Sequence, residues 1–213
     1  MKNNFEITNL IVAFTLSIFS VTFGYADIQT NANNEKELST EGTKTKASNE
    51  ITRSQIILSL RQANEVAKEA EKFGHHPFGA VLLTPDNETV LMKQGQINVV
   101  RHAEIELVRR ATDAYPADYL AKCTLVTTVE PCAMCSGSVY FANIGRVIFG
   151  VTETTLRSLI GTNKMHPTLN MPARKVLQTG QKSVEVIGPV PEMEEEIIAL
   201  HKTFWNKRTS EAK

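Results

Sequence analysis

The sequence has few cysteines and no net charge. Its 213 residues include three cysteines, and Lys plus Arg equal Asp plus Glu at 23 each. Three cysteines argue against the disulfide framework that many small exported domains carry. The balanced charge lacks the basic excess of a dedicated nucleic-acid binder. This balance disfavours a long RNA substrate but does not exclude a local patch of basic residues.

Long hydrophobic runs are also scarce, with one exception near the start of the chain. Lys2 precedes an apolar run from Leu10 to Ala26, which contains Thr, Ser and Gly and ends in a small-x-Ala pattern. The run barely reaches the roughly 20 residues of a membrane-spanning helix, and its pattern is typical of a secretory signal peptide. We expect residues 1–26 to be removed after Ala26, which makes the protein secreted or periplasmic. An uncleaved membrane anchor is the alternative.

Residues 27–50 have almost no large apolar side chain and many Asn, Thr, Glu and Lys. Such a segment cannot bury enough surface to offset its chain entropy, so we expect a disordered linker. The folded domain is therefore expected over 51–213, where no internal repeat is present.

The domain alternates between helical and strand-like patterns. Apolar spacing and turn residues predict, in chain order, a helix over 51–74, strands over 78–84 and 89–96, a helix over 102–115, a strand over 123–130, a helix over 132–144, strands over 146–151 and 183–188, and a helix over 192–208. Residues 156–181 show no regular pattern. This order predicts a three-layer α/β domain with a central mixed sheet.

Two short motifs carry the chemistry. His102-Ala103-Glu104 stands about thirty residues before the P-C-x-x-C motif that contains Cys132 and Cys135. Cysteines at i and i+3 of a helix share a face, and a helix N-terminus favours their thiolate forms. Zinc prefers thiolate and imidazole ligands, and three protein ligands leave a fourth position for water. The two motifs therefore predict a catalytic zinc site.

Glu104 gains a role in such a site. Zinc lowers the pKa of a bound water to about 7, and a neighbouring carboxylate can take that proton and pass it to a ring nitrogen and a leaving amine. H-x-E with P-C-x-x-C is the signature of zinc nucleobase deaminases, in which the Glu is not a ligand.

Each part of the pattern also has a simpler interpretation. A lone C-x-x-C can be a redox pair, a lone histidine is usually structural, and a lone glutamate is usually a solvated helix charge. Cys123 begins a predicted strand and is expected to be a small buried apolar residue. The combination in one order, with Pro131 in place, favours the zinc site over these alternatives.

Three stretches, HPFGAVLL, HAEIELVRRA and EPCAMCSGSVYFANIGRVIFG, resemble the cytidine deaminase-like superfamily, in particular its branch of guanine deaminases and tRNA adenosine deaminases. The resemblance covers most of 51–151. It implies a five-stranded sheet between helices, one Zn2+ per subunit and a homodimer. It places the zinc ligands on His102, Cys132 and Cys135 and the proton shuttle on Glu104.

The resemblance also suggests how substrate is bound. Asn98 matches an asparagine that holds the base, with a turn asparagine as the alternative. Ala80 matches a position whose main-chain N–H contacts substrate. Phe78 lies in the same pocket-lining segment, with core packing as the alternative. Guanine deaminases usually place an acidic residue after the strand that matches 146–150, and Glu153 is the candidate here.

Two departures from the family concern the pocket. The loop between Asn98 and His102 is shorter than in many family members, and the segment 161–180 is longer than in the small tRNA enzymes. A shorter loop changes the mouth of the pocket. The longer segment makes His166 a candidate pocket residue, and the alternative is an ordinary loop histidine.

The leading hypothesis is hydrolytic deamination of a free purine base, guanine-like, or of a nucleoside, with nucleic acid as an unlikely partner. The first alternative is an adenosine-to-inosine deaminase acting on tRNA; the candidate RNA contacts are Phe204, Trp205, Lys207 and Arg208. The second is a non-catalytic binding domain that zinc holds together.

Overall fold

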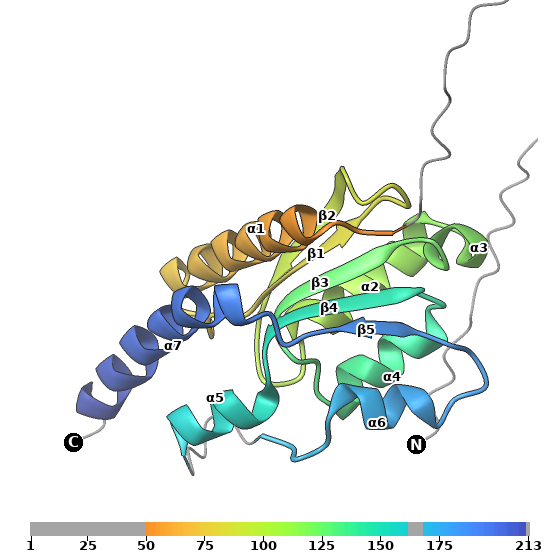
Figure 1. Cartoon of the computed structure of the whole chain (residues 1–213). Helices are drawn as coiled ribbons and strands as arrows, with labels where there is room; N and C mark the ends of the chain where they lie inside the picture. Colours follow the sequence, from red (N-terminus) through yellow and green to blue (C-terminus); the bar gives the residue numbers. More distant parts are fainter. Residues whose placement is uncertain (1–49, 162–167, 212–213) are drawn as a thin grey trace, which may run out of the picture. The chain divides into compact units, whose positions relative to one another are not determined.

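A five-stranded mixed sheet lies at the centre of residues 50–161 and 168–211, which are the residues that the computed structural model describes (Figure 1). The predicted signal peptide, the predicted linker up to residue 49, and His166 lie outside these residues. Among the helices of the described ranges, none combines the length and the apolar character required to cross a bilayer.

The sheet has the order β2-β1-β3-β4-β5. Its strands are β1 (Gly79–Leu83), β2 (Val90–Gly95), β3 (Thr124–Val129), β4 (Arg146–Val151) and β5 (Glu185–Ile187). β1 is antiparallel to both β2 and β3, whereas β3, β4 and β5 run parallel. The prediction of a mixed five-stranded sheet is confirmed.

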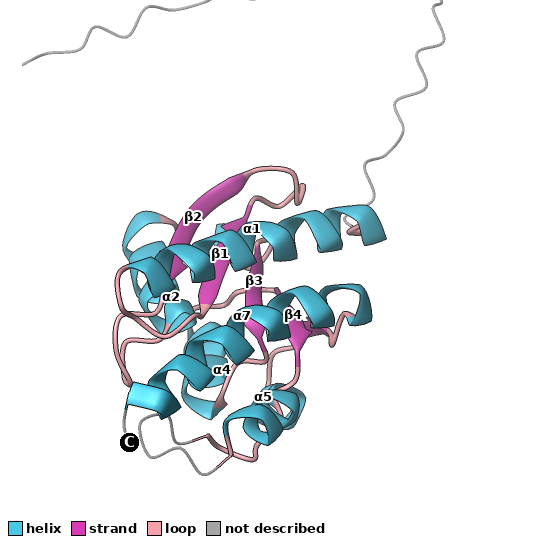
Figure 2. Ribbon diagram, turned by 90° about the vertical axis from the view of Figure 1, so that its left-hand side faces the viewer, coloured by secondary structure: helices cyan, strands magenta, loops and turns pink. Residues whose placement is uncertain are grey.

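Helices cover both faces of the sheet (Figure 2). α1 (Arg53–Lys72) and α7 (Pro191–Glu211) pack on one face, and α2 (Ala103–Ala114) and α4 (Ala133–Phe141) pack on the other, where α6 (Ala173–Gln178) contacts α4. The core accordingly forms two apolar clusters. Leu60, Val126 and Ile197 belong to the first, and Leu107 and Leu125 belong to the second. This arrangement confirms the three-layer α/β fold.

The first helix begins where its sequence predicts. Thr52 is the N-cap of α1, and its side chain accepts a hydrogen bond from the backbone N–H of Gln55 while the Gln55 side chain accepts from Thr52. This reciprocal pair satisfies two backbone donors that the first turn leaves without helical partners. The buried stripe that follows, which includes Leu60 and Ala67, fixes α1 against the sheet.

Three short helices were not predicted. They are α3 (Ala117–Leu120), α5 (Glu153–Ile160) and α6 (Ala173–Gln178). None exceeds about two turns, so none shows a repeating apolar face in the sequence. α5 and α6 lie within or beside the stretch that had no regular pattern, and both border the site described below.

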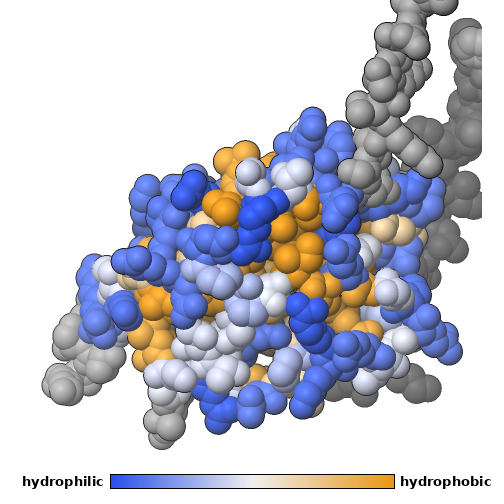
Figure 3. All heavy atoms as spheres, viewed as in Figure 1, coloured by the Kyte–Doolittle hydropathy of each residue, from blue (hydrophilic) through white to orange (hydrophobic). Residues whose placement is uncertain are grey.

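Most of the surface in the view of Figure 3 is hydrophilic, and apolar side chains gather over the middle of the sheet. Partly buried Ile57, Val90 and Ile187 pack against the first core cluster. The outward side chains of the described helices are largely charged, as expected for an amphipathic helix on a sheet.

α1 crosses β1 so closely that only glycine fits at position 79. A Cβ atom there would lie 2.2 Å from the carbonyl oxygen of Ala63 and 2.5 Å from the nitrogen of Ala67. We expect Gly79→Ala to lower the free energy of unfolding by about 1–3 kcal/mol or more, because backbone atoms must move apart. Chemical denaturation measures the change.

Gly137, inside α4, is the matched control, since a Cβ atom there meets nothing within 4 Å. Gly137→Ala should raise the stability by about 0.5–1 kcal/mol. Equal effects of the two substitutions would contradict the close packing of α1 on β1.

Candidate active site

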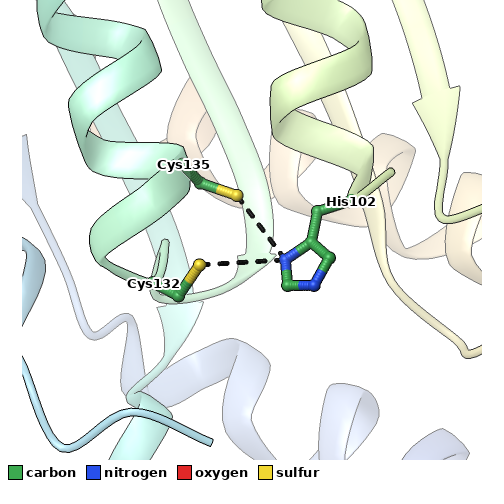
Figure 4. A group of neighbouring side chains, drawn as sticks. All are labelled: His102, Cys132 and Cys135. Carbon is green, nitrogen blue, oxygen red and sulfur yellow. Dashed lines mark hydrogen bonds between the residues drawn. The ribbon is translucent and has the colours of Figure 1, made fainter. Parts of the chain in front are cut away.

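Two helix N-termini bring the motif residues together. His102 is the N-cap of α2, Cys132 is the N-cap of α4, and Cys135 is the third residue of α4. α2 and α4 pack against each other, so the two starts lie side by side. The Nδ1 atom of His102 is 3.8 Å from the sulfur of Cys132 and 3.6 Å from that of Cys135 (Figure 4).

These three side chains fit a metal ion. Zinc lies about 2.3 Å from sulfur and about 2.0–2.1 Å from nitrogen, so a tetrahedral site separates sulfur and nitrogen ligands by about 3.6 Å. The observed separations match, and the three ligand atoms lie within 4.8 Å of one another. His102, Cys132 and Cys135 are therefore able to hold zinc.

The pKa values of the Cys132 and Cys135 thiols shift in opposite directions. A hydrogen bond from the Cys135 thiol, aided by His102, lowers the pKa of Cys132 to about 4. The same hydrogen bond, followed by burial, raises the pKa of Cys135 well above its usual value. All three cysteines of the chain are free, so the pair is not a disulfide. Metal binding requires both sulfurs as thiolates, and the lowered pKa favours that form at Cys132.

Glu104 lies beside the ligands and is buried, with 5% of its surface exposed. Its Oε1 atom accepts a hydrogen bond from the Thr127 hydroxyl at 2.8 Å, and its Oε2 atom is 3.6 Å from the sulfur of Cys135. Burial raises the pKa of Glu104, and the positive charge of His102 acts in the opposite direction. A buried carboxyl group with a raised pKa is suited to exchanging protons near neutral pH.

A cavity of about 310 Å³ opens over this group. Its apolar walls include Phe78, Val99 and Leu169, and its three carboxyl groups are those of Glu104, Glu130 and Glu153. Burial, together with the negative charges of Cys132 and Glu104, raises the pKa of Glu153 to about 7. The site thus contains a second carboxyl group that exists in both protonation states near neutral pH.

Phe78 forms part of the cavity wall and is supported from behind by α7. Its ring meets the ring of His201 edge-on, with centroids 4.9 Å apart, and the indole N–H of Trp205 donates to the Nδ1 atom of His201 at 3.3 Å. Phe204 and Trp205 are both buried. Neither aromatic side chain is therefore accessible for the predicted RNA contact. The side chain of Arg208 is not among those that the structure describes.

Two predicted substrate contacts do not line the cavity. Asn98 is exposed, and its Oδ1 atom accepts from the backbone N–H groups of Val100 and Arg101, at 3.0 and 2.8 Å. Ala80 is fully buried in the second core cluster. The base-binding roles of Asn98 and Ala80 stay predictions. Asn98 closes the short loop that leads into His102.

Three residues near the site had no predicted role: Thr127, Glu130 and His201. Thr127 orients Glu104, and His201 supports Phe78. Both act across large separations in sequence, which no local pattern reveals. Glu130 had a signal, because it directly precedes the P-C-x-x-C motif.

Comparisons with known proteins agree with this geometry. A family model described as the cytidine and deoxycytidylate deaminase zinc-binding region matches residues 53–151. A probable cytosine deaminase from Schizosaccharomyces pombe is 37% identical over 151 residues, which cover 69% of this chain and 90% of the relative. The chain belongs to the cytidine and deoxycytidylate deaminase family, and it is a zinc-binding hydrolase of that family.

More distant relatives differ in their substrates. A guanine deaminase from Bacillus subtilis is 34% identical over 102 residues, 45% of this chain and 64% of the relative. A tRNA-specific adenosine deaminase from Haemophilus influenzae is 33% identical over 99 residues, 44% of this chain and 57% of the relative. A solved guanine deaminase structure from Nitrosomonas europaea has a TM-score of 0.55 at 19% identity and covers 83% of this chain and all of that one; this likeness shows the fold.

Substitution separates metal binding from proton transfer. We expect Cys135→Ser to lose most bound zinc, because a hydroxyl is a poor replacement for a thiolate ligand. Glu104→Gln should keep zinc but lower kcat by about 10²–10⁴-fold, the usual contribution of a general acid–base group. Metal analysis of each purified variant, with deaminase assays, measures both. A Glu104→Gln variant with kcat near wild type would contradict the assignment.

Proposed function

We propose that this protein hydrolytically deaminates a free purine base, guanine-like, or its nucleoside and releases ammonia. The observation that carries the proposal is the position of Glu153, a buried carboxyl group in the same cavity as Glu104 and the three metal-binding residues. A carboxyl group with a pKa near 7 can accept from a ring N–H or donate to a ring nitrogen or carbonyl oxygen. A purine base offers both kinds of partner.

The residues of the chain divide the chemistry among them. His102, Cys132 and Cys135 would hold the zinc ion, which when bound would lower the pKa of a water to about 7. Glu104, fixed by Thr127, would take a proton from that water and pass it to the ring nitrogen. It would then take the proton of the hydroxyl group added to the ring carbon and pass it to the departing amine, which leaves as ammonia. Phe78 and Leu169 line the cavity with apolar surface and limit the access of bulk water.

Cytosine is the second candidate substrate. It is favoured by the Schizosaccharomyces pombe relative, a probable cytosine deaminase, of which this chain covers 90%. A tRNA substrate is less favoured, because three carboxyl groups face the cavity and would repel phosphates. A non-catalytic zinc domain leaves the buried Glu104 without a purpose.

We also propose that the protein is exported after removal of residues 1–26 and that it acts as a homodimer. The support for export is the apolar run from Leu10 to Ala26, and the support for a dimer is family resemblance. N-terminal sequencing of the mature protein tests the export proposal, for which Asp27 is the expected first residue. The molar mass in solution tests the dimer.

The substrate proposal predicts ammonia release from guanine above that from adenine, cytosine and their nucleosides. In addition, Glu153→Gln should raise KM for the preferred base by about tenfold, because Gln cannot switch between accepting and donating at one oxygen. The assay is ammonia release over the six compounds with wild type and variant. Preference for cytosine would select the second candidate, and no activity on any free base or nucleoside would contradict the proposal.

A further inference from the structure

Glu130 joins two helices that border the cavity. It follows β3 directly, and 7% of its surface is exposed. Its Oε1 atom accepts from the backbone N–H of Ala173 at 2.9 Å, and its Oε2 atom accepts from the backbone N–H of Glu153 at 3.3 Å. Ala173 is the first residue of α6, and Glu153 is the first residue of α5.

Both helix starts benefit from an acceptor. The first N–H groups of a helix have no partner within the helix, and a negative charge there is favourable. The N-cap of α6 is Pro172, which makes no side-chain cap hydrogen bond. The N-cap of α5 is Thr152, whose hydroxyl accepts from Thr155 and not from Glu153. The Glu130 carboxylate therefore caps two helices that local residues leave incompletely capped.

Residues that line the cavity lie at the start of α5 and in the segment before α6. The main chain of Glu153 is bonded to Glu130, and the Glu153 side chain lines the cavity. Thr168 and Leu169 line it as well, four to five residues before Ala173. Moving either helix start would change the position of a wall while leaving His102, Cys132 and Cys135 in place, since these belong to α2 and α4.

We propose that Glu130 is a positioning residue for substrate binding: its carboxylate fixes the starts of α5 and α6, and through them Glu153 and Leu169, against the cavity. This inference rests on the proposed function. Both oxygens of Glu130 are engaged by main-chain N–H groups, so it acts through its neighbours. Its effect is on the affinity for the base, whereas Glu104 governs the proton transfer.

The test is Glu130→Gln in the zinc-loaded full chain. Gln keeps the size and one acceptor but turns an NH2 group toward a main-chain N–H, so one of the two bonds is lost. We expect unchanged zinc content, kcat within threefold of wild type and KM raised at least tenfold. Amide hydrogen exchange should become faster in the first turns of α5 and α6, a readout that needs no turnover.

The matched control is Glu196→Gln. Glu196 of α7 also joins two elements. Its Oε1 atom accepts a hydrogen bond from the Asn64 side chain of α1 at 3.2 Å, and its Oε2 atom is 3.5 Å from the Nε atom of Arg61. Glu196 is not among the residues that line the cavity. This control should leave KM unchanged. If Glu130→Gln fails to fold, Ala173→Pro is the second variant. It removes the N–H donor of Ala173 at the first position of a helix, which tolerates proline. Pro172 already has the extended conformation that a following proline requires. This variant should raise KM in the same direction.

An unchanged KM in these variants, with faster exchange or lower stability alone, would overturn the inference and make Glu130 a purely structural clamp. Loss of zinc from Glu130→Gln would overturn it too, since the effect would then pass through the metal. Failure of the proposed function is distinct, because it appears in the wild type as no release of ammonia from any base.

Discussion

Two sulfurs, an imidazole ring and a buried carboxyl group lie together at the starts of α2 and α4. The His102 Nδ1 atom is 3.8 and 3.6 Å from the two sulfurs, and Glu104 is 3.6 Å from that of Cys135. Removing such polar and charged groups from water is costly unless an opposite charge compensates. The hydrogen bond between Cys132 and Cys135 lowers the pKa of the first thiol and raises that of the second. A bound divalent cation would compensate the negative charge of the thiolates and the carboxylate. Metal binding and the packing of the two helix starts would therefore stabilise each other.

Negative charges also act on one another inside the cavity. Glu153 lies near the thiolate and Glu104, and the raised pKa of both carboxyl groups follows from burial first and from neighbouring charge second. Glu153, with a pKa of about 7, can exchange protons near neutral pH, and burial raises the pKa of Glu104 as well. One serves the reacting atoms in our account, and the other serves recognition of the base.

The grouping of His102, Cys132 and Cys135 as residues able to hold a metal could be predicted, because it depends on short motifs and on residue type; the proton-transfer role of Glu104 stays a prediction. The sheet and the long helices followed from apolar periodicity for the same local reason. α5 and α6 could not be predicted, since they are short and the carboxylate that supports their first turns is that of Glu130, which follows β3 and is distant in sequence from α6. The expected role of Asn98 depended on family likeness, and in this chain its oxygen is bonded to the short loop before His102.

The central claim is that one zinc ion is bound by one nitrogen and two sulfurs, with one position left for water. X-ray absorption spectroscopy at the zinc edge of the purified protein tests this most directly. Our account predicts two sulfur neighbours at about 2.3 Å and two light-atom neighbours at about 2.0–2.1 Å. A zinc ion without sulfur neighbours, or a shell of four protein ligands with no exchangeable water, would contradict it.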